Sequence, residues 1–263
     1  MTKKPTKKVP LILTPMSRLT MTFNEELNLD QNKVFNKEYY DNLIARFLEV
    51  QASQNALVKN LGLINTILFL ILHGQEWTIP ILNVEIAQIP AIKEIFVFYS
   101  SLAFYFLCMV FVNAQSYSGL INQCGNRVVD SRLIDPDYYN AAKIEHSFPL
   151  KLYRPKSNIW GVDFFEPGKG FRILSFVNNL TIILAALIIP AIHFGLIGYA
   201  LYLLWDITTP FILAIPYLAI IAILNIGGLL LVIGMSVSFT FYQEIKIEEP
   251  KELPKTKSVK RKS

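Results

Sequence analysis

Residues 211–241 read FILAIPYLAIIAILNIGGLLLVIGMSVSFTF and contain no ionisable side chain except Tyr217. At about 1.5 Å of rise per residue, a helix over such a run is long enough to cross the roughly 30 Å of hydrocarbon in a bilayer. Residues 173–205 form a second run of this kind, with one histidine and two tyrosines as its only ionisable groups. The two runs predict an integral membrane protein.

Two shorter apolar segments complete a predicted set of four membrane spans. Residues 95–112 form a span rich in Phe and Tyr, and Leu61–Leu72 forms the first and weakest one. Only Asn60–Gln75 is free of charge there, which is a little short, but the Lys59 side chain can extend its ammonium group to the interface. The predicted fold class is therefore an all-α integral membrane protein with four transmembrane helices, an amphipathic cytoplasmic helix and a small cytoplasmic loop subdomain.

The basic residues predict the orientation of these spans. Nine of the 25 Lys and Arg residues lie in 1–60, eight in 116–172 and seven in 242–263, while the outer loops hold only Lys93. Basic residues are retained on the cytoplasmic side of membranes, so both termini are expected in the cytoplasm. The Lys-, Ile- and Asn-rich composition favours a bacterial inner (plasma) membrane, and the lipid bilayer is the first expected partner.

The third and fourth runs are longer than one crossing requires. Each spans about 45–50 Å as a helix, against roughly 30 Å of hydrocarbon. We expect them to form a hairpin with a tight outer turn at Asp206–Thr209 and cytoplasmic ends that project beyond the lipid. Pro190 and Pro216 are expected to kink or tilt the helices. An alternative interpretation divides the third run at Pro190 into a re-entrant pair.

The chain divides into six regions on this basis. They are a basic cytoplasmic N-terminal segment (1–38), an amphipathic helix (39–60), transmembrane helices 1 and 2 (61–115) with an outer loop at 76–94, a cytoplasmic loop subdomain (116–172), transmembrane helices 3 and 4 (173–242), and a basic disordered tail (243–263).

The amphipathic helix is predicted from apolar side chains at helical spacing. Tyr40, Leu43, Ile44, Phe47 and Leu48 form one stripe, which either packs on the projecting hairpin or lies on the membrane surface. In the outer loop, alternation around Val84 predicts a short extended piece. The loop Ser116–Arg172 carries a predicted Asp-Pro turn and many aromatic residues, and is the expected docking place of a cytoplasmic protein partner.

Catalytic signatures are missing from the sequence. The segment from Gly161 to Lys169 lacks the spacing and the Ser or Thr of a phosphate-binding loop, and the three histidines have no metal-ligand spacing. No intramembrane carboxylates are paired, and Cys108 and Cys124 are too few for a disulfide scaffold. We therefore expect no enzyme, no cofactor, no metal site and no nucleic-acid partner.

Three polar side chains fall at similar depths in the predicted spans. Counted from the outer ends of their helices, Asn65, His193 and Asn225 lie roughly 16–22 Å deep at 1.5 Å per residue. They are candidates for one polar layer near mid-membrane. Such a layer either serves as interhelical hydrogen bonding or lines a pore, a gate or a proton-sensitive site.

Small residues predict where helices approach closely. The third span carries Ala191, Gly195 and Gly198, and the fourth carries Gly227, Gly228, Gly234 and Ser238. Spacing of four places small residues on one helix face and lets backbones approach. Packing within the hairpin is one expectation, and a subunit interface is the other.

The function class follows from long spans without catalytic groups. Four spans rarely enclose a pathway, so conduction would require a homo-oligomer. The sequence therefore favours a homo-oligomeric pore or channel-like protein, or a gated membrane effector. The alternative is a non-conducting scaffold or accessory subunit that recruits a cytoplasmic partner.

Overall fold

The computed structural model describes residues 6–30, 33–74, 78–79, 84–85, 89, 91–128, 138, 168–205 and 211–246. Four helices in this part of the chain are long and apolar enough to cross a membrane. They are α2 (Lys37–Leu72), α3 (Ile92–Val128), α6 (Lys169–Trp205) and α7 (Phe211–Gly234). The protein is therefore a multi-pass membrane protein, and the predicted number of spans is confirmed.

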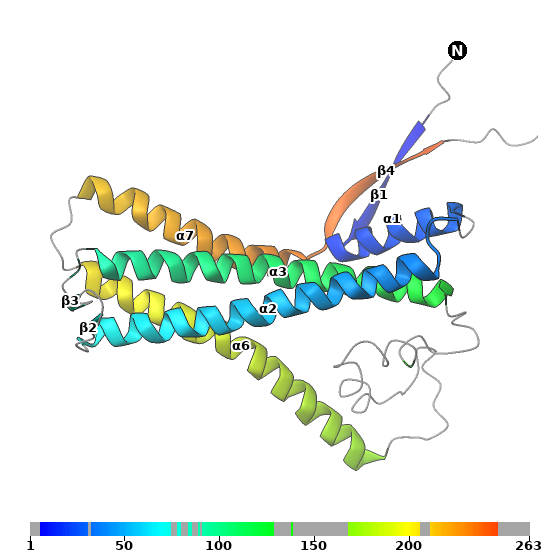
Figure 1. The fold of residues 1–263 in the computed structure, drawn as a ribbon. Coiled ribbons are helices and arrows are strands. Elements are labelled where there is room, and N and C mark those ends of the chain that lie inside the picture. The colour runs from blue at the N-terminus through cyan, green and yellow to red at the C-terminus, as the bar shows by residue number, and fades with distance from the viewer. Residues whose placement is uncertain are drawn as a thin grey trace, which may run out of the picture.

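Helix α3 is the centre of the bundle, with α2 and α7 packed along it (Figure 1). Its 37 residues extend about 55 Å, well beyond the thickness of the hydrocarbon. Near the N-terminal end of α3, Val97 is fully buried beside Leu68 of α2, Ile221 of α7 and Ile197 of α6. Farther along, Leu61 of α2 packs with Phe104 and its neighbours on α3. Buried clusters thus follow one another along α3, and every other span contributes apolar side chains to at least one of them.

The predicted hairpin packing of the third and fourth spans is confirmed only in part, since α6 and α7 meet at the His193–Asn225 hydrogen bond and at Ile197 and Ile221, but α7 packs more extensively on α3. Helix α7 packs mainly against α3, where a Cβ on Gly228 would lie only 3.3 Å from Cys108 Sγ and 3.4 Å from Tyr105 Cα. The small residue lets α7 approach α3 and not α6, because it faces the central helix. Helix α6 continues through Pro190 without interruption, so the re-entrant alternative is wrong. The predicted turn at Asp206–Thr209 lies outside the described residues.

The amphipathic stripe of residues 39–60 packs on α3. Tyr40, Leu43, Ile44 and Phe47 are buried with Ala114, Ile121 and Cys124 of α3, and Leu48 remains 37% exposed. Helix α2 is continuous from this stripe into the first span, as predicted. The projecting helix on which it packs is the extension of the second span, however, and not the hairpin.

The second span is longer than its apolar run. Helix α3 continues through Ser116–Val128, a stretch that the sequence placed in the cytoplasmic loop subdomain. The helix extends this far because Ile121 and Cys124 are buried against α2. The rest of that predicted subdomain, apart from Tyr138 and residues 168–172, lies outside the described residues.

A two-stranded ribbon joins the two ends of the chain. Strand β1 (Thr6–Leu13) pairs antiparallel with β4 (Phe239–Lys246), with Thr6 opposite Lys246 and Leu13 opposite Phe239. The described part of the chain is mostly helical, as the predicted all-α class requires, and this ribbon is a departure from it. Helix α7 ends at Gly234, so the fourth span does not reach residue 242, and residues 243–246 belong to a strand and not to a disordered tail. Residues 247–263 lie outside the described part.

Helix α1 (Pro15–Leu29) connects the ribbon to the bundle. Thr14 caps it, since its side-chain oxygen accepts a hydrogen bond from the Ser17 N–H, and proline occupies the first turn. The helix lies against α3, where Met16 Sδ would be 3.0 Å from a Cβ on Gly119. Arg18 lies 4.8 Å from the Phe241 ring centroid, so α1 also contacts β4.

The corner between α1 and α2 is held by Asp30. Its carboxylate accepts hydrogen bonds of 2.9 Å from the backbone N–H groups of Val34 and Phe35. Partial desolvation raises the pKa of this carboxyl, but the amides of Phe35 and Val34 and the charge of Arg127 outweigh that effect. The pKa of Asp30 is therefore below its ordinary value.

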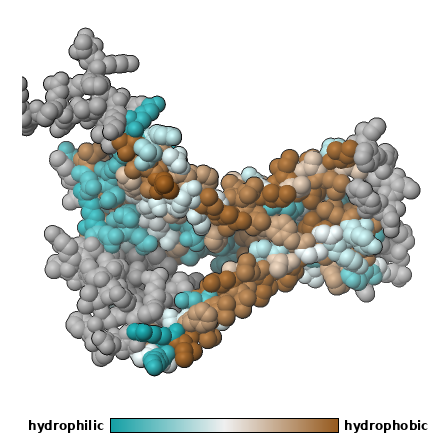
Figure 2. All heavy atoms as spheres, turned by 180° about the vertical axis from the view of Figure 1, so that it is seen from behind, coloured by the Kyte–Doolittle hydropathy of each residue, from teal (hydrophilic) through white to brown (hydrophobic). Residues whose placement is uncertain are grey.

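At the other end of the bundle, β2 (Thr78–Ile79) pairs with β3 (Val84–Glu85). The extended piece predicted around Val84 is thus confirmed at Val84–Glu85, while most of the loop at 76–94 lies outside the described part. The surface agrees with membrane insertion. Figure 2 shows apolar side chains along α6 and over the outer part of the bundle, with hydrophilic side chains gathered near the β1–β4 end.

Candidate functional site

The structure brings Asn65, His193 and Asn225 together in the interior of the bundle, with Ser100 and Ser101 of α3 between them. We call these five residues the polar layer. Their exposed fractions are 8% for Asn65, 4% for Asn225 and 0% for the other three. Each of the four spans contributes at least one of them, so the layer ties α2, α3, α6 and α7 at one level.

His193 and Asn225 form the centre of the layer. His193 Nε2 lies 2.6 Å from Asn225 Oδ1, and Asn225 Nδ2 donates to Ser101 Oγ at 2.8 Å and to the Ile221 carbonyl at 2.9 Å. With Asn225 oriented in this way, its carbonyl oxygen accepts the Nε2 proton of a neutral imidazole. Ser101 in turn donates to the Val97 carbonyl at 2.8 Å, which completes its own bonding.

The second half of the layer joins α3 to α2. Ser100 Oγ donates to Asn65 Oδ1 at 2.5 Å and lies 3.3 Å from His193 Nδ1. The Ser100 hydroxyl has one proton to donate, and it goes to Asn65 Oδ1, the nearer acceptor. The longer contact with His193 Nδ1 is therefore weaker. Ser100 therefore stands between the two helices α2 and α6, which have little other contact at this depth.

Aromatic and aliphatic side chains close the layer. The imidazole of His193 stacks on Phe104 with ring centroids 4.4 Å apart and an interplanar angle of 14°. Ile221, one turn from Asn225, is 2% exposed. None of the five polar residues is acidic, Lys or Arg, so the layer supplies hydrogen bonds and one imidazole but no fixed charge. Its geometry is that of interhelical bonding between spans.

Ser100 and Ser101 were not predicted as site residues. The signal was available, because two adjacent serines interrupt an otherwise apolar and aromatic run at residues 95–112. A hydroxyl in a membrane helix commonly bonds the carbonyl four residues earlier, which makes such serines easy to dismiss. Only their contacts with Asn65 and Asn225 show that these serines also join different helices.

The predicted small residues separate into three groups. Gly228, with Gly227 beside it, faces α3, as described above. Ala191 and Gly195 line a crevice between α6 and α2, while a Cβ on Gly195 or Gly198 would meet no atom within 4 Å. Gly234 ends α7 in open space, and Ser238 lies beyond the helix, so the predicted pairing of these two on one helix face is wrong.

Comparison of the chain with protein-family models gives no match. Comparisons with curated proteins and with solved structures give no match either. We therefore infer function from the residues and geometry above.

Proposed function

We propose that this protein is a non-conducting, non-catalytic membrane scaffold or accessory subunit, which holds a cytoplasmic layer against the membrane. The observation that supports this most is the closed polar layer. Asn65, His193 and Asn225 are buried and bonded to other spans of the same chain, and not exposed along a channel axis. Polar side chains used in this way stabilise a bundle by about 0.6–1.7 kcal/mol per interhelical bond.

The proposed cytoplasmic layer consists of α1, the β1–β4 ribbon and the facing ends of α2 and α3. Two observations support its placement. Of 25 basic residues, 24 lie on the predicted inner side. Independently, β1 pairs with β4, which keeps both chain ends at the same end of the bundle (Figure 1). A bacterial inner membrane with both termini inside is part of this proposal.

The partner is proposed to be a cytoplasmic protein that binds this layer or the segment after α3. Residues 116–128 present one face to α1 and α2, with Gly119 against Met16 and Gly125 against Tyr40, while Asn122 and Asn126 are exposed. Docking at the predicted Ser116–Arg172 loop would therefore use the exposed face of this helix end or residues after Val128. A deletion variant lacking residues 129–167 is expected to lose cross-linking to cytoplasmic proteins in cells, while β1–β4 pairing is kept.

A measurement on one reconstituted sample tests the central claim. Mass is determined in nanodiscs, and conductance is recorded in planar bilayers from the same preparation over a range of voltage and pH. We expect electrical silence whatever the subunit number. Discrete conductance that changes in the variants His193→Ala or Asn225→Leu would reject the scaffold proposal.

A homo-oligomeric pore or gated effector is the second candidate, and one observation favours it. The first half of α6 leaves the bundle (Figure 1), and its apolar side chains are exposed around the helix, with Phe176 at 67% and Leu187 at 57%. Helices from several copies could close around an axis there. Conductance that responds to Asn179→Leu on this arm, but not to changes in the polar layer, would support this candidate.

A further inference from the structure

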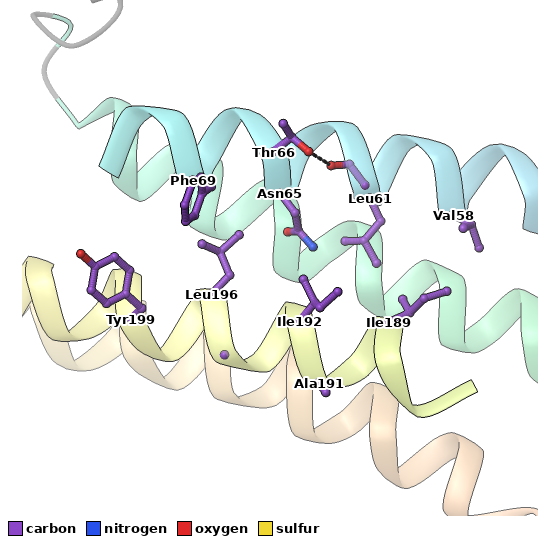
Figure 3. Close-up of a pocket in the computed structure, with 12 residues that line it drawn as sticks. Val58, Leu61, Asn65, Thr66, Phe69, Ile189, Ala191, Ile192, Leu196 and Tyr199 are labelled. Atoms are coloured by element: carbon purple, nitrogen blue, oxygen red, sulfur yellow. Dashed lines mark hydrogen bonds between the residues drawn. The ribbon is translucent and has the colours of Figure 1, made fainter. Parts of the chain in front are cut away.

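A crevice runs between α2 and α6 at the depth of the hydrocarbon. Its volume is about 670 Å³, and its walls come from Val58–Phe69 of α2 and Ile189–Tyr199 of α6 (Figure 3). Buried Leu61 and Leu196 form part of its lining. Phe69 and Ile192, which border it, are 49% and 61% exposed. The crevice therefore has an apolar interior and opens sideways, toward the lipid.

Two glycines widen the crevice. Gly62 on α2 and Gly195 on α6 both line it, and a Cβ on either would meet no atom within 4 Å. Larger side chains here would fill the space between the two helices. The resulting volume lies within the roughly 300–1,000 Å³ typical of small-molecule sites.

Asn65 is the buried polar residue of the crevice lining, since the Thr66 hydroxyl already donates to the Gly62 carbonyl and Tyr199 is 40% exposed. Asn65 is 92% buried, as its exposed fraction of 8% implies, and its Oδ1 accepts the Ser100 hydroxyl. Its Nδ2 has no hydrogen-bond partner within the described part of the chain, and Figure 3 shows the amide directed toward α6. Amide groups inside a protein are normally hydrogen-bonded, and this Nδ2 is left open to the crevice. The crevice thus offers a hydrogen-bond donor to a ligand that brings an acceptor.

We propose that this crevice binds a membrane-dissolved lipid that carries a carbonyl oxygen on an otherwise apolar body, such as a quinone with an aliphatic tail. The carbonyl accepts a hydrogen bond from Asn65 Nδ2, and the apolar body lies between Leu61 and Leu196. This site is independent of the proposed scaffold function, because it depends only on the membrane position of α2 and α6.

A simple acyl chain or a helix from a second copy fits these observations less well. An acyl chain has no acceptor at this depth, about 10 Å from the end of α2 at Leu72, so Asn65 would stay unbonded. A helix has its backbone acceptors already bonded internally and would need a polar side chain placed opposite Asn65. A carbonyl lipid meets both the apolar and the polar requirement.

Fluorescence quenching tests the proposal in lipid vesicles. The three native tryptophans are changed to Phe, and Phe69→Trp supplies a reporter in the crevice. Decyl-benzoquinone serves as probe, because it has carbonyl acceptors and quenches indole fluorescence. Ile223→Trp, at a position 68% exposed on α7, is the control reporter. We expect saturable quenching at position 69, at about tenfold lower probe content than the non-saturable quenching at position 223.

Matched variants separate binding from general effects on the fold. Gly195→Leu fills the crevice and is expected to abolish the saturable component. Gly198→Leu adds the same side chain on α6, also into open space but outside the crevice lining, and is expected to leave it unchanged. Asn65→Leu is expected to weaken binding about tenfold, the equivalent of one hydrogen bond.

Three results would overturn the proposal. The first is non-saturable quenching of equal strength at positions 69 and 223. The second is saturable quenching that Gly195→Leu leaves intact. The third is a reporter at position 69 that the probe does not reach, together with an oligomer that Gly195→Leu dissociates in native mass spectrometry. This third result would assign the crevice to a helix of another copy. If Asn65→Leu does not fold, the Gly195 and Gly198 pair still decides.

Discussion

Replacing Asn225 by leucine removes the central member of the polar layer at nearly constant volume. The side chain joins α7 to α6 through His193 Nε2, at 2.6 Å, and to α3 through Ser101 Oγ, at 2.8 Å. Interhelical hydrogen bonds in membranes average about 0.6 kcal/mol and reach about 1.7 kcal/mol, so the two together contribute roughly 1–3 kcal/mol. The change also leaves the His193 N–H buried without an acceptor, which costs about 1–3 kcal/mol more.

Asn225→Leu should therefore lower the free energy of unfolding by about 2–6 kcal/mol, or by about 1–3 kcal/mol if the imidazole finds another partner. The measurement is unfolding in bicelles by steric trapping, with helix content followed by circular dichroism. Asn179→Leu is the control, since it makes the same chemical change at an exposed position of α6 and should alter stability by less than about 0.5 kcal/mol.

A double-mutant cycle with His193→Ala isolates the central bond. The two changes should be non-additive by at least about 0.5 kcal/mol, because the residues are in direct contact. If Asn225→Leu is as stable as the parent protein, or if the two changes simply add, the polar layer does not hold the spans together and the reasoning above is refuted.

Three further predictions address other contacts. Gly228→Leu should destabilise the bundle by about 1–3 kcal/mol, because the larger side chain is overpacked against Tyr105 and Cys108. Gly198→Leu, whose side chain enters open space, should leave stability unchanged. Equal unfolding curves for the two variants would contradict the α3–α7 packing. Val9 and Gln243 face each other in the ribbon, so cysteines at these two positions should form a disulfide on mild oxidation once Cys108 and Cys124 are changed to Ala. A cysteine pair at Val9 and Phe239 should not form one. Gel mobility distinguishes cross-linked from free protein, and equal cross-linking of the two pairs would show that the register is wrong. The stabilising effect of Asp30 should be present above about pH 4 and be lost as the pH falls through its lowered pKa, because protonation removes the acceptor for Val34 and Phe35. The protection factors of the Val34 and Phe35 amides, which compare the observed exchange with the intrinsic rate at the same pH, should fall at low pH in the parent protein and be low at every pH in Asp30→Ala.

The depth of the polar residues was readable from the sequence, but their partners were not. Counting residues from the span ends placed Asn65, His193 and Asn225 at similar levels, because rise per residue is fixed within a helix. The rotation of each helix about its axis is set by packing with its neighbours. For that reason Ser100 and Ser101 became members of the layer only in the folded bundle.

The ends of the fourth span show a different limit. The charge-free run continues to Tyr242, yet α7 stops at Gly234 and the chain turns into β4. A lack of charge reports compatibility with lipid, and it does not report where a helix ends. Strand β4 forms because β1, from the opposite end of the chain, supplies its hydrogen-bond partners, and no local pattern contains that information.

The sequence by itself determined that the protein has four segments able to cross a membrane, since that ability depends on apolar length against a fixed hydrocarbon thickness, a property read along one dimension. The same is true of the stripe on α2, whose period fixes which side chains share a face. Only the tertiary structure decided that α7 packs on α3, that α6 leaves the bundle and that a crevice opens beside Asn65. Those features depend on how side chains from distant segments fit together in three dimensions. Within lipid there is no hydrophobic driving force between apolar helix surfaces, so an apolar sequence pattern does not say which helices pack together.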